Sequence, residues 1–333
     1  MAAPGFVLLD KPLGDTSFKS LFPLKRLFGT RRIGHAGTLD LRASGLIIAA
    51  VERATRLLPF VEAESKLYTF NLHLGFGTDT LEWDGVLKEQ AEAVNITAED
   101  VERVIPNFIG DIKQVPPDYS AIKINGHRAS DLMERGREVT LPARDVKIFS
   151  LKLLGPAEAP ENCSGKPFAS FAMECHCSKG TYIRSLCRDL GKALGTLGVV
   201  SGIRRMAIGK VRVEDAFKAE DLTVGSILSA DKILPYPVLR LPADQIAIVR
   251  NGNWLPYKTC PVELGEDRLL FVADEDGVIQ SLCYFEPGRI RPKFFIGPDD
   301  EETAAKYNNK VKKNVTKPKP LNNENAGATA SES

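Results

Sequence analysis

Residues 34–40 read Gly-His-Ala-Gly-Thr-Leu-Asp, and three residues later the apolar run Ser-Gly-Leu-Ile-Ile-Ala-Ala occupies positions 44–50. The run is short enough for a buried strand, and the glycines before it allow backbone turns that other residues resist. We therefore predict a glycine-rich loop that ends at Asp40, just before a strand. An aspartate in this position is often only a turn former, so these residues alone leave a structural and a catalytic role open.

The charges around this loop are unevenly distributed. Between residues 16 and 39 there is no acidic residue, and the basic residues are Lys19, Lys25, Arg26, Arg31 and Arg32. Asp40 is thus a lone carboxylate at the edge of a basic stretch. This arrangement suits an enzyme that holds a polyanion and attacks it with a carboxylate.

The composition of the whole chain is that of an ordinary soluble protein. Its 333 residues are 43% hydrophobic and 26% charged, with a net charge of +1, so only local clusters of charge can indicate a nucleic-acid partner. We find no apolar run as long as a membrane span and no apolar core of a signal peptide. We expect no membrane partner and a cytoplasmic location.

The cysteines give little reason to expect a metal. The six cysteines form no Cys-x-x-Cys pair, although Cys175–His176–Cys177 suggests zinc at first sight. On a strand the two thiols point one way and the imidazole the other. We therefore favour reduced thiols on a buried face over a metal site.

Periodicity and turn residues predict the main elements. Strands are expected at 6–10, 66–75 and 169–177, and helices are expected to begin after caps at Thr16 or Ser17, at Thr97 and at Thr181. From about residue 236 the pattern changes to short strands separated by turns, predicted at 238–241, 245–249, 268–272 and 278–282.

Several blocks of the sequence resemble the TruB family of tRNA pseudouridine synthases. Residues 34–50 resemble its catalytic motif, and blocks at 10–17, 119–129, 176–186 and 202–209 resemble further motifs in the family's order. The resemblance covers residues 5–215. It implies an α/β (α+β) pseudouridine synthase fold with a mixed, largely antiparallel central sheet, followed by a small C-terminal β-rich PUA-like domain.

The sequence pattern and the resemblance together predict a domain organisation. We expect a catalytic domain at 1–236, a PUA-like RNA-binding domain at 237–298, and a disordered tail rich in Lys and Asn at 299–333. An insertion at about 119–147 would close on RNA. A solvated loop and helix is the alternative for that insertion.

The resemblance also implies roles for individual residues. Asp40 would be the catalytic carboxylate, Arg184 its ionic partner, and Tyr68 the ring that stacks on the uracil and handles the C5 proton. Arg184 lies in the first turn of a helix, where a cation is disfavoured, so either Asp40 or a phosphate compensates it or it is simply exposed. The remaining substrate-binding candidates are His35, Tyr182, Ile203, Lys11, Lys179, Arg31 and Arg32.

Within this set, Tyr182 and Ile203 would wall the uracil pocket. His35 would fill the gap left by a flipped nucleotide, or it is only a satisfied loop histidine. The chain departs from the family pattern at Leu41, Ser44 and Glu52, and it has Ile203 where leucine is usual. None of these exchanges removes a catalytic group.

The implied function is conversion of uridine 55 in the T loop of tRNA to pseudouridine, by a monomer and without a metal or cofactor. The alternatives are a tRNA-binding or tRNA-folding module without turnover and a synthase that acts on other RNA. A glycosidase would need two paired carboxylates, whereas only Asp40 stands out here.

Overall fold

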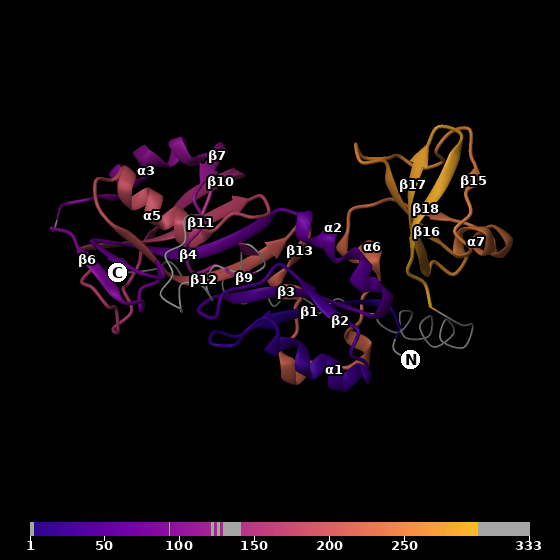
Figure 1. Cartoon of the computed structure of the whole chain (residues 1–333), viewed down its shortest axis with the longest axis horizontal. Coiled ribbons are helices and arrows are strands. Elements are labelled where there is room, and N and C mark those ends of the chain that lie inside the picture. Colours follow the sequence, from indigo (N-terminus) through magenta and orange to yellow (C-terminus); the bar gives the residue numbers. More distant parts are fainter. Residues whose placement is uncertain (1–2, 93, 121–122, 125–126, 129–140, 299–333) are drawn as a thin grey trace, which may run out of the picture.

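The computed structural model describes residues 3–92, 94–120, 123–124, 127–128 and 141–298. The tail expected at 299–333 and most of the insertion expected at 119–147 lie outside these residues. Within the described residues, no helix is long and apolar enough to cross a membrane. The chain forms two units that lie next to each other (Figure 1).

The first unit is built on a nine-stranded sheet. Across the sheet the strands are β1 (Gly5–Lys11), β3 (Ser44–Val51), β12 (Gly198–Ile208), β4 (Lys66–Leu74), β11 (Ala169–Cys177), β10 (Arg144–Pro156) and β7 (Gly110–Gln114), with β2 (Ile33–Ala36) on β3 and β13 (Val211–Arg212) on β12. Among the described strands of this sheet, only β12 and β3 pair in parallel. The sheet is mixed and largely antiparallel, which confirms the predicted fold class.

Two helices pack against the sheet. The helix α5 (Ile183–Ala193) packs against β12 and β4, and α3 (Ala98–Val104) packs against β10. The remaining elements of this unit are η1 (Lys19–Leu21), α1 (Phe22–Phe28), η2 (Glu52–Leu57), α2 (Leu58–Ala63), β5 (Phe76–Thr78), β6 (Leu87–Gln90), η3 (Ile105–Phe108), β8 (Lys123–Ile124), β9 (His127–Arg128), η4 (Val213–Asp215), η5 (Ala219–Asp221), η6 (Val224–Ser226) and α6 (Ala230–Ile233).

One of the three predicted helix caps forms, since Thr97 makes a capping box with Asp100 before α3. The Thr16 hydroxyl accepts the Lys19 N–H at 3.1 Å, but the N-cap of η1 is Phe18, which makes no side-chain cap, so the cap predicted at Thr16 or Ser17 is wrong. The prediction for Thr181 is wrong, because α5 begins one residue later and its N-cap, Tyr182, makes no side-chain cap. The Thr181 hydroxyl instead donates to the Ser178 carbonyl at 3.0 Å, which closes the turn before the helix.

Within residues 238–298, the second unit is a five-stranded sheet with the helix α7. Its strand order is β14 (Val238–Arg240), β16 (Leu269–Ala273), β17 (Ile279–Glu286), β18 (Arg289–Phe295) and β15 (Leu255–Pro256). The strand predicted at 245–249 is wrong, because these residues belong to α7 (Ala243–Arg250). The alternating Ile246 and Ile248 suggested a strand, but Ile246 and Val249, three positions apart, are the residues that pack into the core.

The two units share one apolar core. Phe6 and Leu8 on β1 belong to the same buried cluster as Phe271, Ile279 and Ile296 of the second unit. A hydrogen bond from Arg56 Nη1 to the Phe295 carbonyl, at 3.2 Å, adds a polar contact. The second unit therefore packs against the first through this shared cluster and through contacts with η2 and α2, where the rings of Phe60 and Phe294 meet edge to face.

Candidate active site

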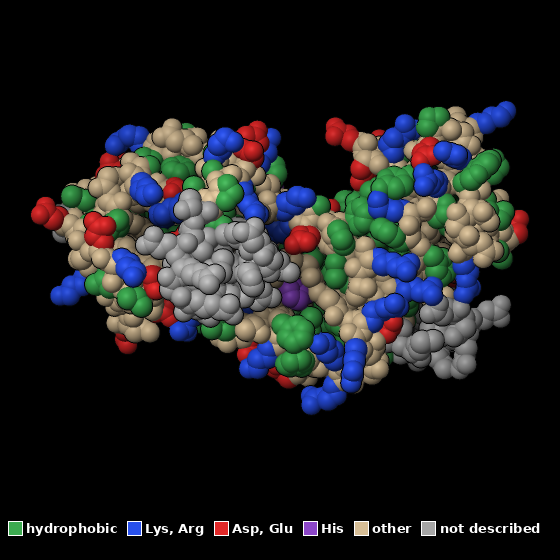
Figure 2. Space-filling model, in the orientation of Figure 1, with side chains coloured by type: hydrophobic (Ala, Val, Ile, Leu, Met, Phe, Trp, Pro, Cys, Tyr) green, Lys and Arg blue, Asp and Glu red, His purple; other side chains and the backbone are tan. Residues whose placement is uncertain are grey.

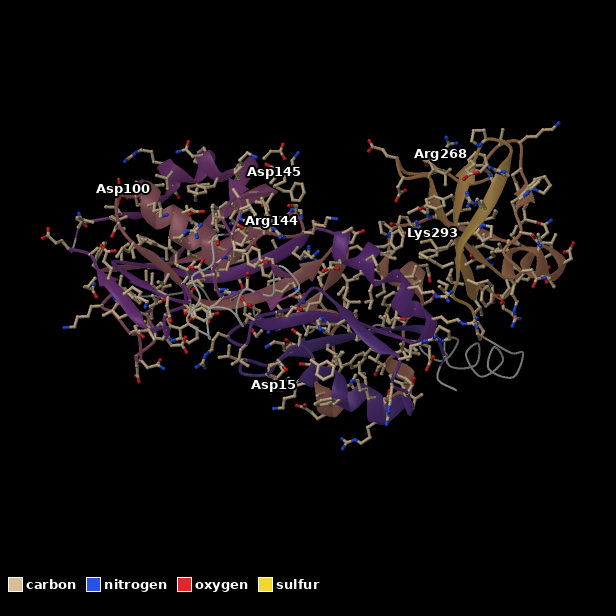
Figure 3. All side chains as sticks on the ribbon, in the orientation of Figure 1. Asp15, Asp100, Arg144, Asp145, Arg268 and Lys293 are labelled. Carbon is tan, nitrogen blue, oxygen red and sulfur yellow. The ribbon has the colours of Figure 1, made fainter. Side chains whose placement is uncertain are left out.

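A cleft of about 740 Å³ opens in the first unit, where six segments distant in sequence meet. They are the loop at 37–43, α2, the start of β4, the start of β10, the segment 178–184 and β12. Arg144 and Asp145, labelled in Figure 3, line the cleft from the start of β10. Lys and Arg side chains, with acidic ones among them, are spread over the face of both units shown in Figure 2.

The loop that carries Asp40 is held on both sides. The Ser17 hydroxyl accepts the Leu39 N–H at 2.9 Å and lies 3.1 Å from the Leu39 carbonyl, to which it donates. Beyond Asp40, the Lys11 ammonium donates to the Ala43 carbonyl at 2.6 Å. Both contacts are buried, so the carboxylate projects from a fixed backbone.

Glycine permits the close packing beneath this loop. Gly45 has a φ of +101°, and a Cβ there would lie 2.4 Å from the Arg205 carbonyl oxygen. Because Gly45 has no Cβ, β12 can pair with β3 next to the loop that carries Asp40. The Arg205 guanidinium then donates to Leu46 at 2.7 Å and to Gly37 at 3.0 Å, which fixes the start of the loop.

Asp40 and Arg184 form an ion pair at the cleft. Arg184 Nε lies 2.9 Å from Asp40 Oδ2, and the arginine side chain is 5% exposed whereas the aspartate is 43% exposed. The Nε–H makes no aligned hydrogen bond within the described structure, so the contact is ionic. Arg184 Nη1 also donates to the Thr80 carbonyl at 3.2 Å. The pair presents an open carboxylate in front of a buried cation.

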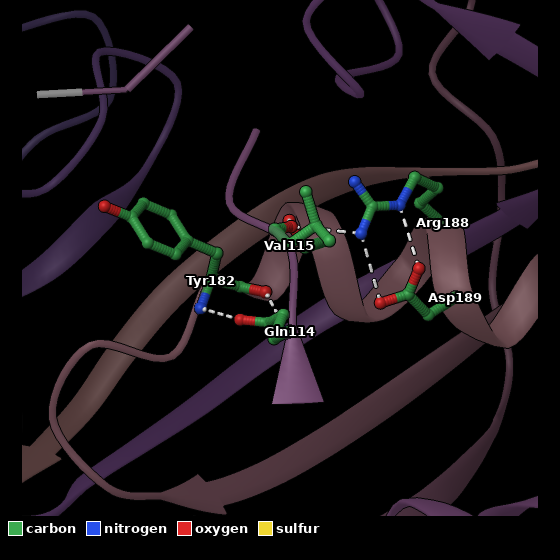
Figure 4. Close-up of polar contacts among 6 residues, drawn as sticks. Gln114, Val115, Tyr182, Arg188 and Asp189 are labelled. Atoms are coloured by element: carbon green, nitrogen blue, oxygen red, sulfur yellow. Dashed lines mark hydrogen bonds and ion pairs between the residues drawn. The ribbon is translucent and has the colours of Figure 1, made fainter. Parts of the chain in front are cut away.

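The start of α5, which carries Arg184, is fastened to the end of β7. Gln114 accepts the Tyr182 N–H at 2.8 Å and donates to the Tyr182 carbonyl at 3.1 Å (Figure 4). One turn further, Ser185 and Arg188 both donate to the Val115 carbonyl. These contacts set the position of Arg184 relative to the loop.

Three predicted pocket residues line the cleft together with this pair. Tyr68 on β4 is half-buried, and burial raises the pKa of its phenol. Burial also raises the pKa of the Tyr182 phenol. Ile203 lies at the irregular part of β12 and is 6% exposed. An apolar wall and two aromatic rings thus surround Asp40.

The other predicted binding residues are more scattered. Lys179 is exposed and lines the cleft, whereas Arg31 and Arg32 are exposed before β2 and do not line it. His35 lies on β2 outside the lining, and burial lowers the pKa of its imidazole. Lys11 is fully buried, with its ammonium on backbone carbonyls, so it holds the loop and offers no group to a ligand.

Two basic residues of the cleft were missed from the sequence. Arg205 is 1% exposed, and it ties β12 to the loop. Lys66 lies at the start of β4 beside the cleft, and burial lowers the pKa of its ammonium to about 8. Its Nζ donates to the carbonyls of Glu62 and Glu64. Both read as ordinary charged residues in the sequence, which gives no sign of their burial.

Glu82 was also missed, and it lies close to the ion pair. Its Oε1 is buried without a hydrogen-bond partner among the described residues. Burial raises the pKa of this carboxyl to about 7, with Arg184 acting to lower it and Asp40 to raise it. In the sequence Glu82 looks like an acid in a turn between Thr78 and Gly85.

The site has the components of acid–base or nucleophilic chemistry by one carboxylate. In the described part of the chain, no three His, Cys, Asp or Glu side chains gather closely enough to hold a metal. Cys175 and Cys177 are buried and free, and His176 points elsewhere, 2.9 Å from the Ser65 hydroxyl. The candidate site is therefore Asp40 with Arg184, surrounded by Tyr68, Tyr182 and Ile203.

Known proteins with similar sequences match most of this chain. Residues 25–183 match the family model described as TruB family pseudouridylate synthase (N terminal domain). A protein of Mycobacterium bovis named tRNA pseudouridine synthase B is 35% identical over 299 residues, which cover 89% of this chain and 96% of that protein. One of the same name from Corynebacterium efficiens is 38% identical over 255 residues, covering 75% of this chain and 84% of the relative.

Solved structures share the fold at lower identity. A structure described as a Cbf5-Nop10-Gar1 complex matches with a TM-score of 0.65 and 20% identity, covering 88% of this chain and 85% of that chain. An H/ACA RNP bound to a substrate RNA containing 2′-deoxyuridine gives a TM-score of 0.62 and 18% identity, covering 89% and 86%. A relative is 35% identical over 89% of this chain, and the family model matches residues 25–183. The chain therefore belongs to the TruB family of pseudouridylate synthases.

Proposed function

We propose that the protein converts a uridine of tRNA to pseudouridine, with Asp40 as the catalytic residue. The observation that carries this proposal is the ion pair of Asp40 with the buried Arg184, 2.9 Å apart, in a cleft lined by aromatic and basic side chains. Curated relatives at 35–38% identity are named tRNA pseudouridine synthase B. Binding alone would not need an open carboxylate in a site for a polyanion.

The reaction is an isomerisation. The bond between N1 of the uracil and C1′ of the ribose breaks, a bond from C5 to C1′ forms, C5 loses a proton and N1 gains one. The Asp40 carboxylate acts as nucleophile or base, on the ribose or on the uracil ring. Arg184 compensates the charge of the carboxylate and orients it, since it is itself fixed by Thr80 and by the start of α5.

The remaining cleft residues bind and orient the nucleotide. Tyr68 stacks on the displaced uracil, which lowers the cost of unstacking it from the RNA. A phenol is neutral at neutral pH, and burial raises the pKa of Tyr68 further. Stacking is therefore its main contribution, and transfer of the C5 proton is a second one. Ile203 and Tyr182 close the sides of the pocket, and Lys179 and Arg144 face the phosphates.

The finer details of the substrate follow the family resemblance. The target is uridine 55 in the T arm, and the reaction takes place in the cytoplasm, where tRNA is used. The protein is proposed to act as a monomer. The second unit binds RNA beyond the T arm.

The test uses Asp40→Asn, which keeps the shape of the side chain and removes its charge. The variant should bind unmodified tRNA within a few-fold of the wild type and lose turnover by about a thousandfold or more. Pseudouridine is mapped in the tRNA after incubation, with an isolated T-arm stem-loop as second substrate. If the wild type binds tRNA but forms no pseudouridine, the result would instead support an RNA-binding module. If the Asp40→Asn variant forms pseudouridine, Asp40 is excluded as the catalytic group.

A further inference from the structure

The exposed face of the segment 18–25 carries aromatic residues that the core does not use. Phe18 is 57% exposed and Phe22 is 51% exposed, whereas Leu21 and Leu24 on the other side are buried. Phe18, Phe22 and Lys25 follow at spacings of four and three residues, so they form one stripe along η1 and α1. A second apolar stripe on a helix that already has a buried face needs an explanation.

The three side chains of this stripe contact one another. The rings of Phe18 and Phe22 meet edge to face, with centroids 5.3 Å apart. The Lys25 ammonium lies 4.2 Å from the centroid of Phe18 and 5.2 Å from that of Phe22. Together they form an aromatic platform with a cation on it, which we call the α1 platform.

The surroundings of the α1 platform are basic. Between residues 16 and 39 the chain has no acidic residue, and Lys19, Arg26, Arg31 and Arg32 are exposed there. Two of these cations have acidic partners from outside the segment, since Lys19 lies 2.7 Å from Asp15 and Arg32 lies 3.8 Å from Glu52. Figure 2 shows hydrophobic and basic side chains next to each other in the lower part of the molecule, where α1 lies in Figure 1. Aromatic faces interleaved with cations complement an RNA strand, because bases stack on the rings while phosphates meet the cations.

The α1 platform is joined directly to the catalytic loop. Ser17, the neighbour of Phe18, holds Leu39 through two buried hydrogen bonds, and Leu39 precedes Asp40. The loop on the other side is held by the Gly14 N–H, which donates to the Leu41 carbonyl at 3.0 Å. A nucleotide on the platform would thus be held in a fixed relation to one in the cleft.

We propose that the α1 platform stacks an unpaired base of the same RNA whose uridine enters the cleft, at a position outside the target nucleotide. The inference rests on the proposed function for the identity of the RNA. Its occupant is a single-stranded nucleotide and not a duplex, since the rings of a platform need an unstacked base. The platform therefore adds affinity and register without taking part in the chemistry.

The test is the double variant Phe18→Leu/Phe22→Leu, which keeps an apolar helix surface and removes the rings. We expect KM for tRNA to rise about 5- to 30-fold while kcat is retained, and Kd for a single-stranded oligouridine to rise similarly. Affinity for a blunt RNA duplex should not change. The slope of affinity against salt should also be unchanged, because no charge is removed, whereas Lys25→Gln should reduce it.

Phe149→Leu is the matched control, since Phe149 is 45% exposed on β10 and lies outside the basic segment. It should leave KM and Kd as in the wild type, and circular dichroism and melting should show that all variants fold. Unchanged oligouridine and tRNA binding by the double variant would overturn the proposal, as would an equal loss on the duplex. If the wild type forms no pseudouridine but the double variant still loses single-strand affinity, the proposed function fails and the platform stands.

Discussion

Exchanging Glu82 for glutamine should make the protein more stable at high pH. The carboxyl of Glu82 is buried, with one oxygen unpartnered in the described structure, and burial raises its pKa from 4.5 to about 7. In the unfolded chain the group ionises at its ordinary value. The folded state therefore has its full stability below about pH 4.5, loses stability as the pH rises towards 7, and keeps a constant penalty above that.

The size of this penalty follows from the two pKa values. A pKa raised from 4.5 to about 7 corresponds to roughly 3 kcal/mol in the free energy of unfolding. Between pH 5 and pH 8 the wild type should lose about 2 kcal/mol through Glu82. Glutamine has no charge at either pH, so Glu82→Gln should not show this loss.

The assay is urea unfolding of the wild type and Glu82→Gln at pH 5 and pH 8. All other titrating groups are common to both proteins. The unfolding free energy of the wild type is subtracted from that of Glu82→Gln at each pH, and the change in this difference from pH 5 to pH 8 comes from Glu82 alone. Glu89→Gln on β6, where the glutamate is exposed, is the matched control and should follow the wild type. A difference between wild type and Glu82→Gln that stays the same at both pH values would refute a buried, perturbed Glu82.

Three further outcomes are expected. Arg184→Gln should reduce kcat by about 100-fold or more, because the Asp40 carboxylate loses its orienting partner, while tRNA affinity in a filter-binding assay stays within a few-fold; an active variant would make the ion pair dispensable. Arg204 makes a bidentate contact with Asp10, at 2.9 and 2.7 Å, and both side chains are partly exposed. A double-mutant cycle of Arg204→Met and Asp10→Asn should therefore give a coupling energy of about 1 kcal/mol, and a value near zero would contradict this. Gly45→Ala should destabilise the protein by about 2–4 kcal/mol in thermal melts, because its Cβ would lie 2.4 Å from a backbone oxygen. Gly14 also has a positive φ but has open space around it, so Gly14→Ala should cost only about 1 kcal/mol. Equal effects of the two substitutions would show that backbone conformation alone matters.

The sequence was sufficient for features that rest on local pattern. The apolar run after Asp40 predicted β3, and the capping box at Thr97 predicted the start of α3, because each depends on neighbouring residues. The motifs also brought Asp40 and Arg184 together, and the structure places them in contact. The helix α7 was missed because Ile246 and Ile248 alternate as in a strand, although Ile248 is exposed in the structure.

The sequence was not sufficient for features that depend on burial from distant segments. Arg205 and Glu82 look like solvent-exposed charges in the sequence, and only the packing of β12 and of the loop at 79–85 removes them from water. Lys11 was predicted to bind substrate because it is basic and lies in a family motif. Its complete burial follows from the close approach of Ala43, which no local pattern records.

The apolar cluster shared by the two units also affects how the chain folds during its synthesis. Phe6 and Leu8 are made long before Phe271, Ile279 and Ile296, which belong to the same buried cluster. At a synthesis rate of roughly 5–20 residues per second, Phe6 and Leu8 remain without these other members of the cluster for many seconds. We expect nascent chains stopped before residue 270 to expose this apolar surface and to aggregate, and we expect β1 to reach its final packing late in folding.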